Sequence, residues 1–241
     1  MNLPHVSAAP VEVVATTAGP AIRRVGLWSA VLTTVWAIGF TAAFVWQAVA
    51  SPPSMTWQDL EAYAASFNPA SLAAVLVPSL LLAPSYVALV AAVHGGAPDG
   101  RRVWSGMGLA FAVIYAGVAS LNYTVQLVVL RGNLLGGEPQ GLALVAMGNP
   151  RSLFWGLAIL GYDFYLALSA LFLVPALGRG KLEGWIGRLF AVNAAASIVA
   201  GVNYFVTLDA YHPLGLVASV VWCLAFPTAT TLMAVRFRRL A

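Results

Sequence analysis

Six apolar runs, each long enough to cross a bilayer as a helix, constrain this chain more than any other feature. They cover residues 27–50, 71–94, 104–130, 152–177, 185–207 and 213–235. About 20 helical residues span the hydrocarbon core of a membrane. Only 8% of the residues are charged, whereas soluble domains carry about 25%. The runs lack the alternation of barrel strands, so the sequence predicts an all-α polytopic membrane protein with six transmembrane helices.

The chain before the first run is polar and has no apolar period. We expect residues 1–24 to form a disordered cytoplasmic tail and residues 25–241 to form a single six-helix transmembrane domain. In an alternative interpretation, Ala48-Val49-Ala50 is a cleavage site and residues 1–50 are a removable signal peptide. We favour a retained helix, because the apolar core of a signal peptide has only about 7–15 residues and no long polar leader.

Cationic residues gather on one side of the predicted topology. Ten of the 12 Lys and Arg residues lie there: Arg23, Arg24, Arg101, Arg102, Arg179, Lys181, Arg188, Arg236, Arg238 and Arg239. Only Arg131 and Arg151 lie on the other side. The positive-inside bias therefore predicts that both termini are cytoplasmic, the N-in/C-in arrangement. Nucleic acid is not an expected partner, because no basic stripe is interleaved with aromatic residues.

A tandem repeat relates the second and third runs to the fourth and fifth. Residues 68–127 align with residues 149–208 without a gap, at a constant offset of 81. The matched pairs include Asn68-Pro69 with Asn149-Pro150, Trp104 with Trp185, Gly106 with Gly187, and Asn122-Tyr123 with Asn203-Tyr204. We expect two helical hairpins of the same orientation, related by an axis along the membrane normal. In each copy the Asn is expected to cap a helix whose first turn contains the Pro.

The last run leaves open a third copy of the repeat. Pro227 follows Pro213 by 14 residues, much as Pro84 follows Pro69 by 15. The first run would then be the distant partner of the last. Because proline commonly opens a helix, this spacing has an equally simple local explanation.

Cysteine, histidine and motif content exclude several kinds of chemistry. Cys223 is the single cysteine, so no disulfide or cysteine cluster forms within one chain. The histidines, His5, His94 and His212, lie on the tail and at the predicted membrane faces. No phosphate-binding glycine loop, zinc-binding pair or nucleophile elbow occurs. We therefore expect no cofactor and no metal, and any chemistry would depend on carboxylates, amides and phenols.

Polar side chains recur at helical spacing along several of the runs. Amides and hydroxyls that face lipid are costly, so we expect these stripes to face other helices. The candidate ligand-binding residues are Asn122, Tyr123, Gln126, Tyr162, Asn203 and Tyr204. They are predicted to line a pocket in the outer half of the bundle. In the alternative, the Asn-Tyr pairs only join helix ends to one another. An aromatic wall built around Trp36 and Trp222 is a further alternative.

Asp163 is the only acidic residue in the interior of a run, and its counterpart in the first copy is Leu82. A carboxylate at that depth costs at least about 2.5 kcal/mol on insertion scales, so it is a functional candidate by default. We name Asp163 as the candidate catalytic residue, a general acid aided by Tyr162 or by one of the Asn-Tyr pairs. The structural alternative is a protonated Asp163 hydrogen-bonded to Asn122, Tyr123, Asn203 or Tyr204.

Gly161-Tyr162-Asp163, followed by Leu173-Val174-Pro175 and the turn into Gly184-Trp185-Ile186-Gly187-Arg188, resembles part of an uncharacterised family of bacterial six-helix inner-membrane proteins. The resemblance covers mainly the fourth and fifth runs. It implies a multi-pass protein of the bacterial inner membrane and brings no activity and no site residues with it.

Two function classes follow from the residues. In the first, the protein binds a small amphipathic or lipid-like ligand in a polar-lined intramembrane pocket, for transport or sensing. In the second, it is a small intramembrane enzyme that uses Asp163 as a general acid on an apolar substrate. A purely structural role in a larger complex is a third interpretation. Membrane lipids and a small hydrophobic or amphipathic ligand are the expected partners.

Overall fold

The computed structural model describes residues 19–50 and 57–240. In these ranges it is helical without strands, and six helices are long and apolar enough to cross a membrane. They are α1 (Pro20–Ala50), α3 (Pro69–Gly95), α4 (Arg102–Thr124) with the π-helix η3 (Val125–Leu130) and α5 (Arg131–Leu135), α6 (Leu153–Ile159) with the π-helix η5 (Leu160–Leu166) and α7 (Ala167–Leu177), α8 (Lys181–Thr207) and α9 (Pro213–Arg239). The short α2 (Leu60–Ala65) and the 3₁₀ turns η2 (Asp99–Arg101) and η4 (Leu142–Leu144) lie in the connections. The predicted all-α, six-span fold is confirmed.

The predicted tail falls largely outside the described residues, which begin at residue 19. Residues 20–24 already belong to α1. The first helix thus starts before the first apolar run, because Pro20 is suited to a first turn, where its missing N–H leaves no bond unmade.

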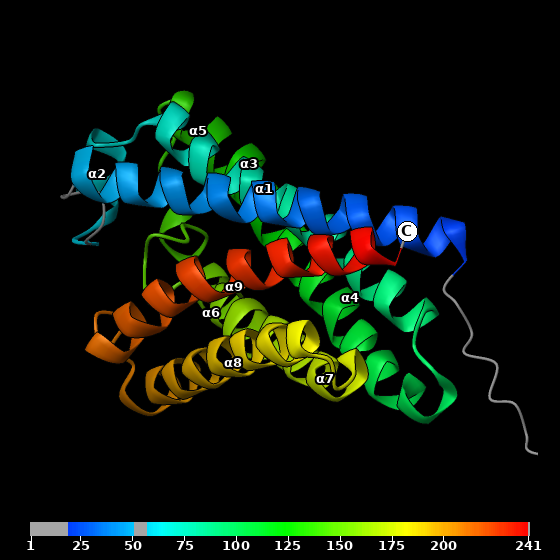
Figure 1. Ribbon diagram of the computed structural model, residues 1–241. Coiled ribbons are helices and arrows are strands. Elements are labelled where there is room, and N and C mark those ends of the chain that lie inside the picture. Colours follow the sequence, from blue (N-terminus) through cyan, green and yellow to red (C-terminus); the bar gives the residue numbers. More distant parts are fainter. Residues whose placement is uncertain (1–18, 51–56, 241) are drawn as a thin grey trace, which may run out of the picture.

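The six spans form a ring in chain order. α1 packs on α3, α3 on α4, and α4 on η5 and α7. α8 then packs on η5 and α7 on one side and on α9 on the other, and α9 returns to α1. Figure 1 shows α9 lying beside α1, which closes the ring. Each hairpin therefore has a neighbour on both sides, and the polar faces can meet inside.

The two ends of the bundle differ in charge. The start of α1, the end of α9 and the α3–α4 and α7–α8 connections lie at one end (Figure 1). These segments and the helix starts that follow them carry nine of the cations, and Arg188 of α8 is the tenth. We call this the cation-rich end. The opposite, cation-poor end holds α2 and the connection between α5 and α6, with Arg131 and Arg151. Which end faces the cytoplasm stays a prediction.

The first copy of the repeat begins its helix as expected. Asn68 caps α3, since its Oδ1 accepts hydrogen bonds from the backbone N–H groups of Ala70 and Ser71 at 3.0 and 3.1 Å. Pro69 occupies the first helical position. A polar cap and a first-turn proline satisfy the helix end without any tertiary contact.

The second copy begins differently, and the prediction that Asn149 caps the helix is wrong. α6 starts at Leu153, and its cap is Ser152, whose Oγ accepts from the N–H of Trp155 at 3.0 Å. Asn149 lies before the helix, where its Nδ2 donates to Ala143 O at 2.7 Å. Its Oδ1 accepts from the N–H of Arg151 at 3.0 Å, as Asn68 Oδ1 accepts from Ala70, but the helix of the second copy begins only after Ser152. The repeat itself stays a prediction.

Small residues let the spans approach closely at two points. Ser169 of α7 donates a hydrogen bond to the carbonyl of Gly108 in α4 at 2.7 Å, and the Tyr86 hydroxyl of α3 lies 3.0 Å from Ser169 Oγ. A Cβ added to Gly201 of α8 would lie 2.8 Å from Asp163 Cβ. Close approach at small residues, with hydrogen bonds between helices, is a common way to hold membrane bundles together.

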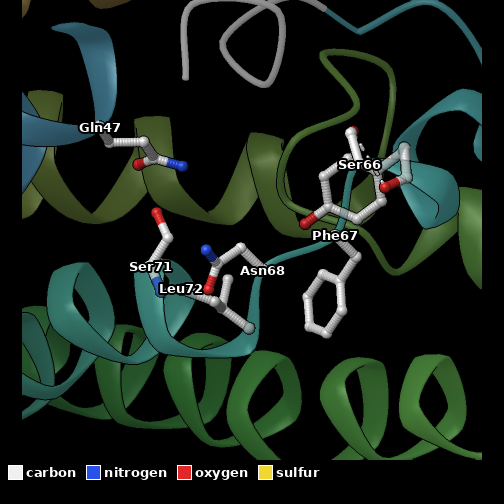
Figure 2. A pocket seen from close by; sticks show the side chains of 7 residues that line it. Gln47, Ser66, Phe67, Asn68, Ser71 and Leu72 are labelled. Atoms are coloured by element: carbon white, nitrogen blue, oxygen red, sulfur yellow. Dashed lines mark hydrogen bonds between the residues drawn. The ribbon is translucent and has the colours of Figure 1, made fainter. Parts of the chain in front are cut away.

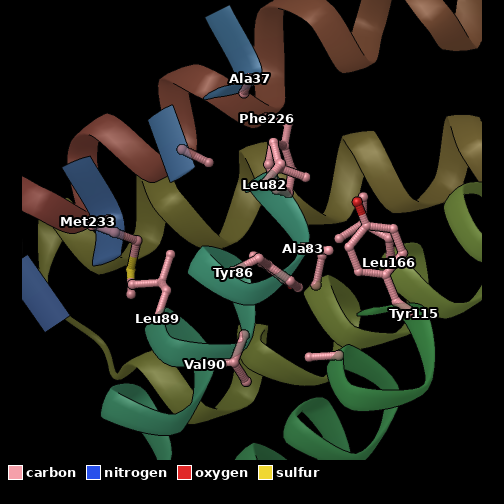
Figure 3. Packing of buried hydrophobic residues seen from close by; sticks show 14 of the residues in the cluster. Ala37, Leu82, Ala83, Tyr86, Leu89, Val90, Tyr115, Leu166, Phe226 and Met233 are labelled. Atoms are coloured by element: carbon pink, nitrogen blue, oxygen red, sulfur yellow. The ribbon is translucent and has the colours of Figure 1, made fainter. Parts of the chain in front are cut away.

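The apolar core centres on α3. Leu82, Tyr86 and Leu89 are buried and face α1 and α9, where Figure 3 shows Phe226 and Met233. The same core continues through Tyr115 of α4 and Leu173 of α7 to Phe190 of α8, so it fills the inside of the ring. Leu82, the counterpart of Asp163 in the repeat, belongs to this core.

Candidate functional site

Gln126 of η3 forms hydrogen bonds through both polar atoms of its side chain to the backbone of the connection between α5 and α6. Its Nε2 donates to Val145 O at 2.8 Å, and its Oε1 accepts from the N–H of Met147 at 2.9 Å. The side chain is fully buried. Both atoms of the amide thus satisfy backbone groups that would otherwise be unpaired away from water. The amide of this predicted ligand-binding residue is therefore already bonded to backbone on both sides.

Tyr204 bonds to the same connection, and Asn122 bonds to the first turn of α6, which follows it. Asn122 Nδ2 of α4 donates to Phe154 O at 3.0 Å. The Tyr204 hydroxyl of α8 donates to Pro150 O. Together with Gln126, they fasten the chain between Val145 and Phe154 to the cation-poor half of the bundle. Three of the six predicted ligand-binding side chains are therefore brought together by one backbone segment.

The predicted residues Tyr123 and Tyr162 belong instead to a cluster of phenols. The rings of Tyr115 and Tyr162 lie 5.3 Å apart, and those of Tyr123 and Tyr162 lie 6.5 Å apart. Their hydroxyls, with that of Ser79, interact electrostatically. Tyr115 Oη is nevertheless buried and has no partner at hydrogen-bond geometry in the part of the chain that the structure describes. The cluster is thus polar but incompletely satisfied.

This cluster is part of a closed circuit of aromatic rings inside the helical ring. Successive centroids are 6.2 Å apart for Tyr86 and Tyr115, 5.3 Å for Tyr115 and Tyr162, 5.9 Å for Tyr162 and Trp222, 5.3 Å for Trp222 and Phe226, and 5.5 Å for Phe226 and Tyr86. The five rings come from α3, α4, η5 and α9. These rings occupy the middle of the bundle. Their packing therefore disfavours a ligand site that opens along the bundle axis.

Asp163 lies off this circuit, in the seam between η5 and α8. Its Cβ packs against Gly201, and the ring of the next residue, Phe164, packs against the same glycine. Phe164 in turn stacks on Phe205 of α8 at 5.4 Å. The carboxyl has no hydrogen bond or ion pair in the described part of the chain, and the side chain is part-exposed. The predicted bonds to Asn122, Tyr123, Asn203 or Tyr204 are absent there.

The local backbone around Asp163 is itself unusual. η5 is a π-helix that joins α6 to α7, and Asp163 is at its centre. Short π segments inside longer helices are rare and frequently occur at functional sites. Because a π turn adds a residue to the helical turn, it changes which residues face α4 and α8. This arrangement places Tyr162 on the aromatic circuit and Asp163 in the α8 seam.

Other acids and possible metal ligands lie far from Asp163 along the spans. The remaining acids among residues 57–240 are at helix ends or in connections: Asp59, Glu61, Asp99, Glu138, Glu183 and Asp209. Within the described ranges, no three His, Cys, Asp or Glu side chains gather at metal-binding distance. Asp163 therefore has no described carboxylate or imidazole beside it with which to share a proton.

Two hollows occur elsewhere on the molecule. One, of about 40 Å³, lies at the cation-poor end and is lined by Gln47, Tyr63, Ser66, Phe67, Asn68, Ser71 and Leu72 (Figure 2). The other is an open groove of about 580 Å³ along α1, lined by Ile38, Thr41, Ala42, Val45, Trp46 and Val49. Neither includes a predicted site residue. The hollow at the cation-poor end is about the size of a single water molecule. The groove along α1 lies on a helix surface that would contact lipid in a membrane.

Sequence reasoning did not predict which inward-facing polar side chains would lack a hydrogen-bond partner. Asn193 of α8 is the clearest case, since both its Nδ2 and Oδ1 are buried and find no hydrogen-bond partner among residues 19–50 and 57–240. Trp222 Nε1 is unpaired in the same way. Sequence spacing places such residues on an inward face but does not reveal which ones lack a hydrogen bond.

The fold and the charge distribution define the class: this is a multi-pass, α-helical integral membrane protein. Comparison with protein-family models, with curated proteins and with solved structures finds no match for the chain. The resemblance to a bacterial inner-membrane family therefore stays a prediction.

Proposed function

We propose that this membrane protein binds a small amphipathic or lipid-like ligand, for transport or sensing, with Asp163 as the polar anchor. The observation that carries the proposal is the unpaired carboxyl of Asp163 in the seam between η5 and α8. A carboxyl group in the apolar interior of a membrane is costly unless it is paired. A polar group of the ligand would supply the missing partner.

The surroundings of Asp163 support an amphipathic ligand that enters from the lipid side. Phe164 and Phe205 form a stacked pair next to the carboxyl, and Phe205 is 51% exposed. The apolar part of a ligand would lie along this pair while its polar part reaches Asp163. The aromatic circuit occupies the middle of the bundle, which favours this lateral approach over a route along the axis. We further propose the N-in/C-in orientation in the bacterial inner membrane, which places Asp163 in the outer half.

The remaining predicted residues fit this proposal unequally. Asn203 has no side-chain hydrogen bond among the described residues, and the hydroxyls of Tyr123 and Tyr162 interact only with one another and with those of Tyr115 and Ser79, so Tyr123, Tyr162 and Asn203 are the further candidates for ligand contact. Asn122, Gln126 and Tyr204 are already bonded to backbone. Catalysis is less well supported, because Tyr162 faces Tyr115 and Trp222 rather than a second proton-transfer group.

Native mass spectrometry of the full chain, extracted gently in detergent, tests the proposal. The wild-type protein should carry an adduct of lipid-like mass that Asp163→Asn loses. Glu138→Gln is the matched control, because it removes one negative charge from an exposed connection at the same end of the bundle. This control should keep the adduct. Lack of any adduct on the wild type, or equal retention by Asp163→Asn, would overturn the proposal.

A further inference from the structure

We propose a second, independent site: the seam between α4 and α7 binds an anionic phospholipid at the cation-rich end of the bundle. It is separate from the Asp163 site, which lies in the seam between η5 and α8. Two features carry this inference. One is a group of cations without acidic partners, and the other is a row of stacked aromatic rings that begins directly beside it.

The cations come from two connections that the fold brings together. Arg101 ends the α3–α4 connection, and its Nη1 lies 3.0 Å from where a Cβ on Gly178 would be, in the α7–α8 connection. Arg179 and Lys181 flank the same turn and are exposed. Three cationic residues from two connections thus lie at or next to Gly178.

The acids at this end do not neutralise the group. Among the described residues they are Asp99 and Glu183. Asp99 pairs with Arg102 at 3.2 Å, and Glu183 pairs with Arg236 of α9 at 3.4 Å. Arg101, Arg179 and Lys181 have no ion pair within the described ranges. Basic groups between transmembrane helices at the membrane surface attract anionic head groups at about 1 kcal/mol for each cation.

The aromatic row runs from this group along the seam toward the middle of the membrane. Trp104 stacks on Phe172 at 6.1 Å, and Phe172 stacks on Phe111 at 5.6 Å with an interplanar angle of 3°. Phe111 then stacks on Tyr165 at 6.3 Å. Trp104 is 44% exposed, and the other three rings are part-exposed. The row is therefore accessible from the lipid side.

The two features match the two parts of one lipid molecule. A phosphate group at the membrane surface would meet Arg101, Arg179 and Lys181, and an acyl chain would lie along Trp104, Phe172 and Phe111. Tryptophan also prefers the interfacial depth at which head group and chain meet. A soluble phosphate would use only the cations, so the continuity of the two features favours the lipid.

The test uses full-length protein in a neutral detergent and phosphatidylglycerol as the probe, with phosphatidylcholine for comparison. Binding is measured by native mass spectrometry across a lipid titration. Arg101→Gln/Arg179→Gln/Lys181→Gln should weaken phosphatidylglycerol binding by roughly fivefold per cation, on the order of 100-fold in total. The matched control, Arg24→Gln/Arg238→Gln/Arg239→Gln, removes the same charge from the same end but outside the seam. It should change binding by less than about threefold, since direct contact and not overall charge dominates.

Three further arms keep the proposal falsifiable if the triple variant folds poorly. Lys181→Gln alone, an exposed substitution, should weaken binding about fivefold. Phe172→Leu should reduce phosphatidylglycerol retention while leaving the cations in place. Glycerol phosphate in excess should not displace the lipid. Equal losses in the two triple variants, equal binding of phosphatidylcholine, or displacement by glycerol phosphate would each overturn the inference.

Discussion

Gln126 and Asp163 lie in two π-helical turns of neighbouring spans, yet their surroundings differ completely. Both polar atoms of Gln126 bond to the backbone of the connection before α6. Asp163 has no such bond among the described residues and packs against Gly201. In a membrane, a satisfied buried polar group stabilises the fold, whereas an unsatisfied one opposes it. Polarity inside a span therefore identifies an inward-facing residue but not its role, which depends on its partners.

The Asn-Tyr pairs show the same divergence within the repeat. In the first copy the asparagine is the bonding member, because Asn122 donates to Phe154 O. In the second copy it is the tyrosine, because Tyr204 donates to Pro150 O. Both bonds reach the start of the fourth span, which lies between them. The pairs are thus not two equivalent ligand anchors, although their sequences match.

The largest effect is expected for Gln126→Leu. Leucine leaves Val145 O and Met147 N without partners away from water, at a cost of about 1–3 kcal/mol for each group. We expect the free energy of unfolding in detergent to fall by about 2–6 kcal/mol, measured by thermal or denaturant titration.

Asn133→Ala serves as the control for Gln126. Asn133 is bonded to its own helix through Val129 O and is only part-buried, so its loss should cost less than about 1 kcal/mol. Equal effects of the two substitutions would show that Gln126 does not hold the connection.

The next effect concerns the seam that holds Asp163. In Gly201→Ala, the new methyl would lie 2.7 Å from the Phe164 ring and 2.8 Å from Asp163 Cβ. η5 and α8 must therefore separate, which should destabilise the protein by about 1–3 kcal/mol and weaken ligand retention.

Gly184→Ala is the companion substitution on the same helix, where nothing lies within 4 Å. It should be neutral or stabilising by up to about 1 kcal/mol, since alanine favours helix more than glycine. If Gly201→Ala behaves like Gly184→Ala, the seam is not closely packed.

A smaller effect is expected for Ser169→Ala. Ser169, like Gln126 and unlike Asp163, is a buried polar residue whose side chain is hydrogen-bonded. The substitution removes the bonds to Gly108 O and the Tyr86 hydroxyl. Hydrogen bonds between membrane helices average about 0.6 kcal/mol each, so a loss of about 1 kcal/mol is expected by thermal unfolding. Ser219→Ala, an exposed serine bonded only to its own helix, should have no measurable effect.

The sequence was sufficient to predict the spans, because about 20 apolar residues in a row have few other stable states. It also identified Asn68 as a cap and Asp163 as an unusual acid. It did not reveal that Asn149 precedes its helix, since Ser152 offers an equally good cap three residues later. Nor did it separate Gln126 from Asp163, because their partners come from segments that only the folded ring brings near. The π-helical turns leave no simple period in the sequence.

The most direct test of the contrast between Gln126 and Asp163 is the free energy of unfolding of Asp163→Asn compared with that of the wild type, with both proteins in detergent and freed of bound ligand, because a retained ligand would itself stabilise the wild type. Asparagine keeps nearly the same shape and removes the ionisable group. If Asp163 stabilises nothing in the folded protein, the free energy of unfolding should stay within about 1 kcal/mol of the wild-type value or rise. A loss of about 2 kcal/mol or more would contradict this account and would show that the carboxyl is a structural hydrogen-bonding group.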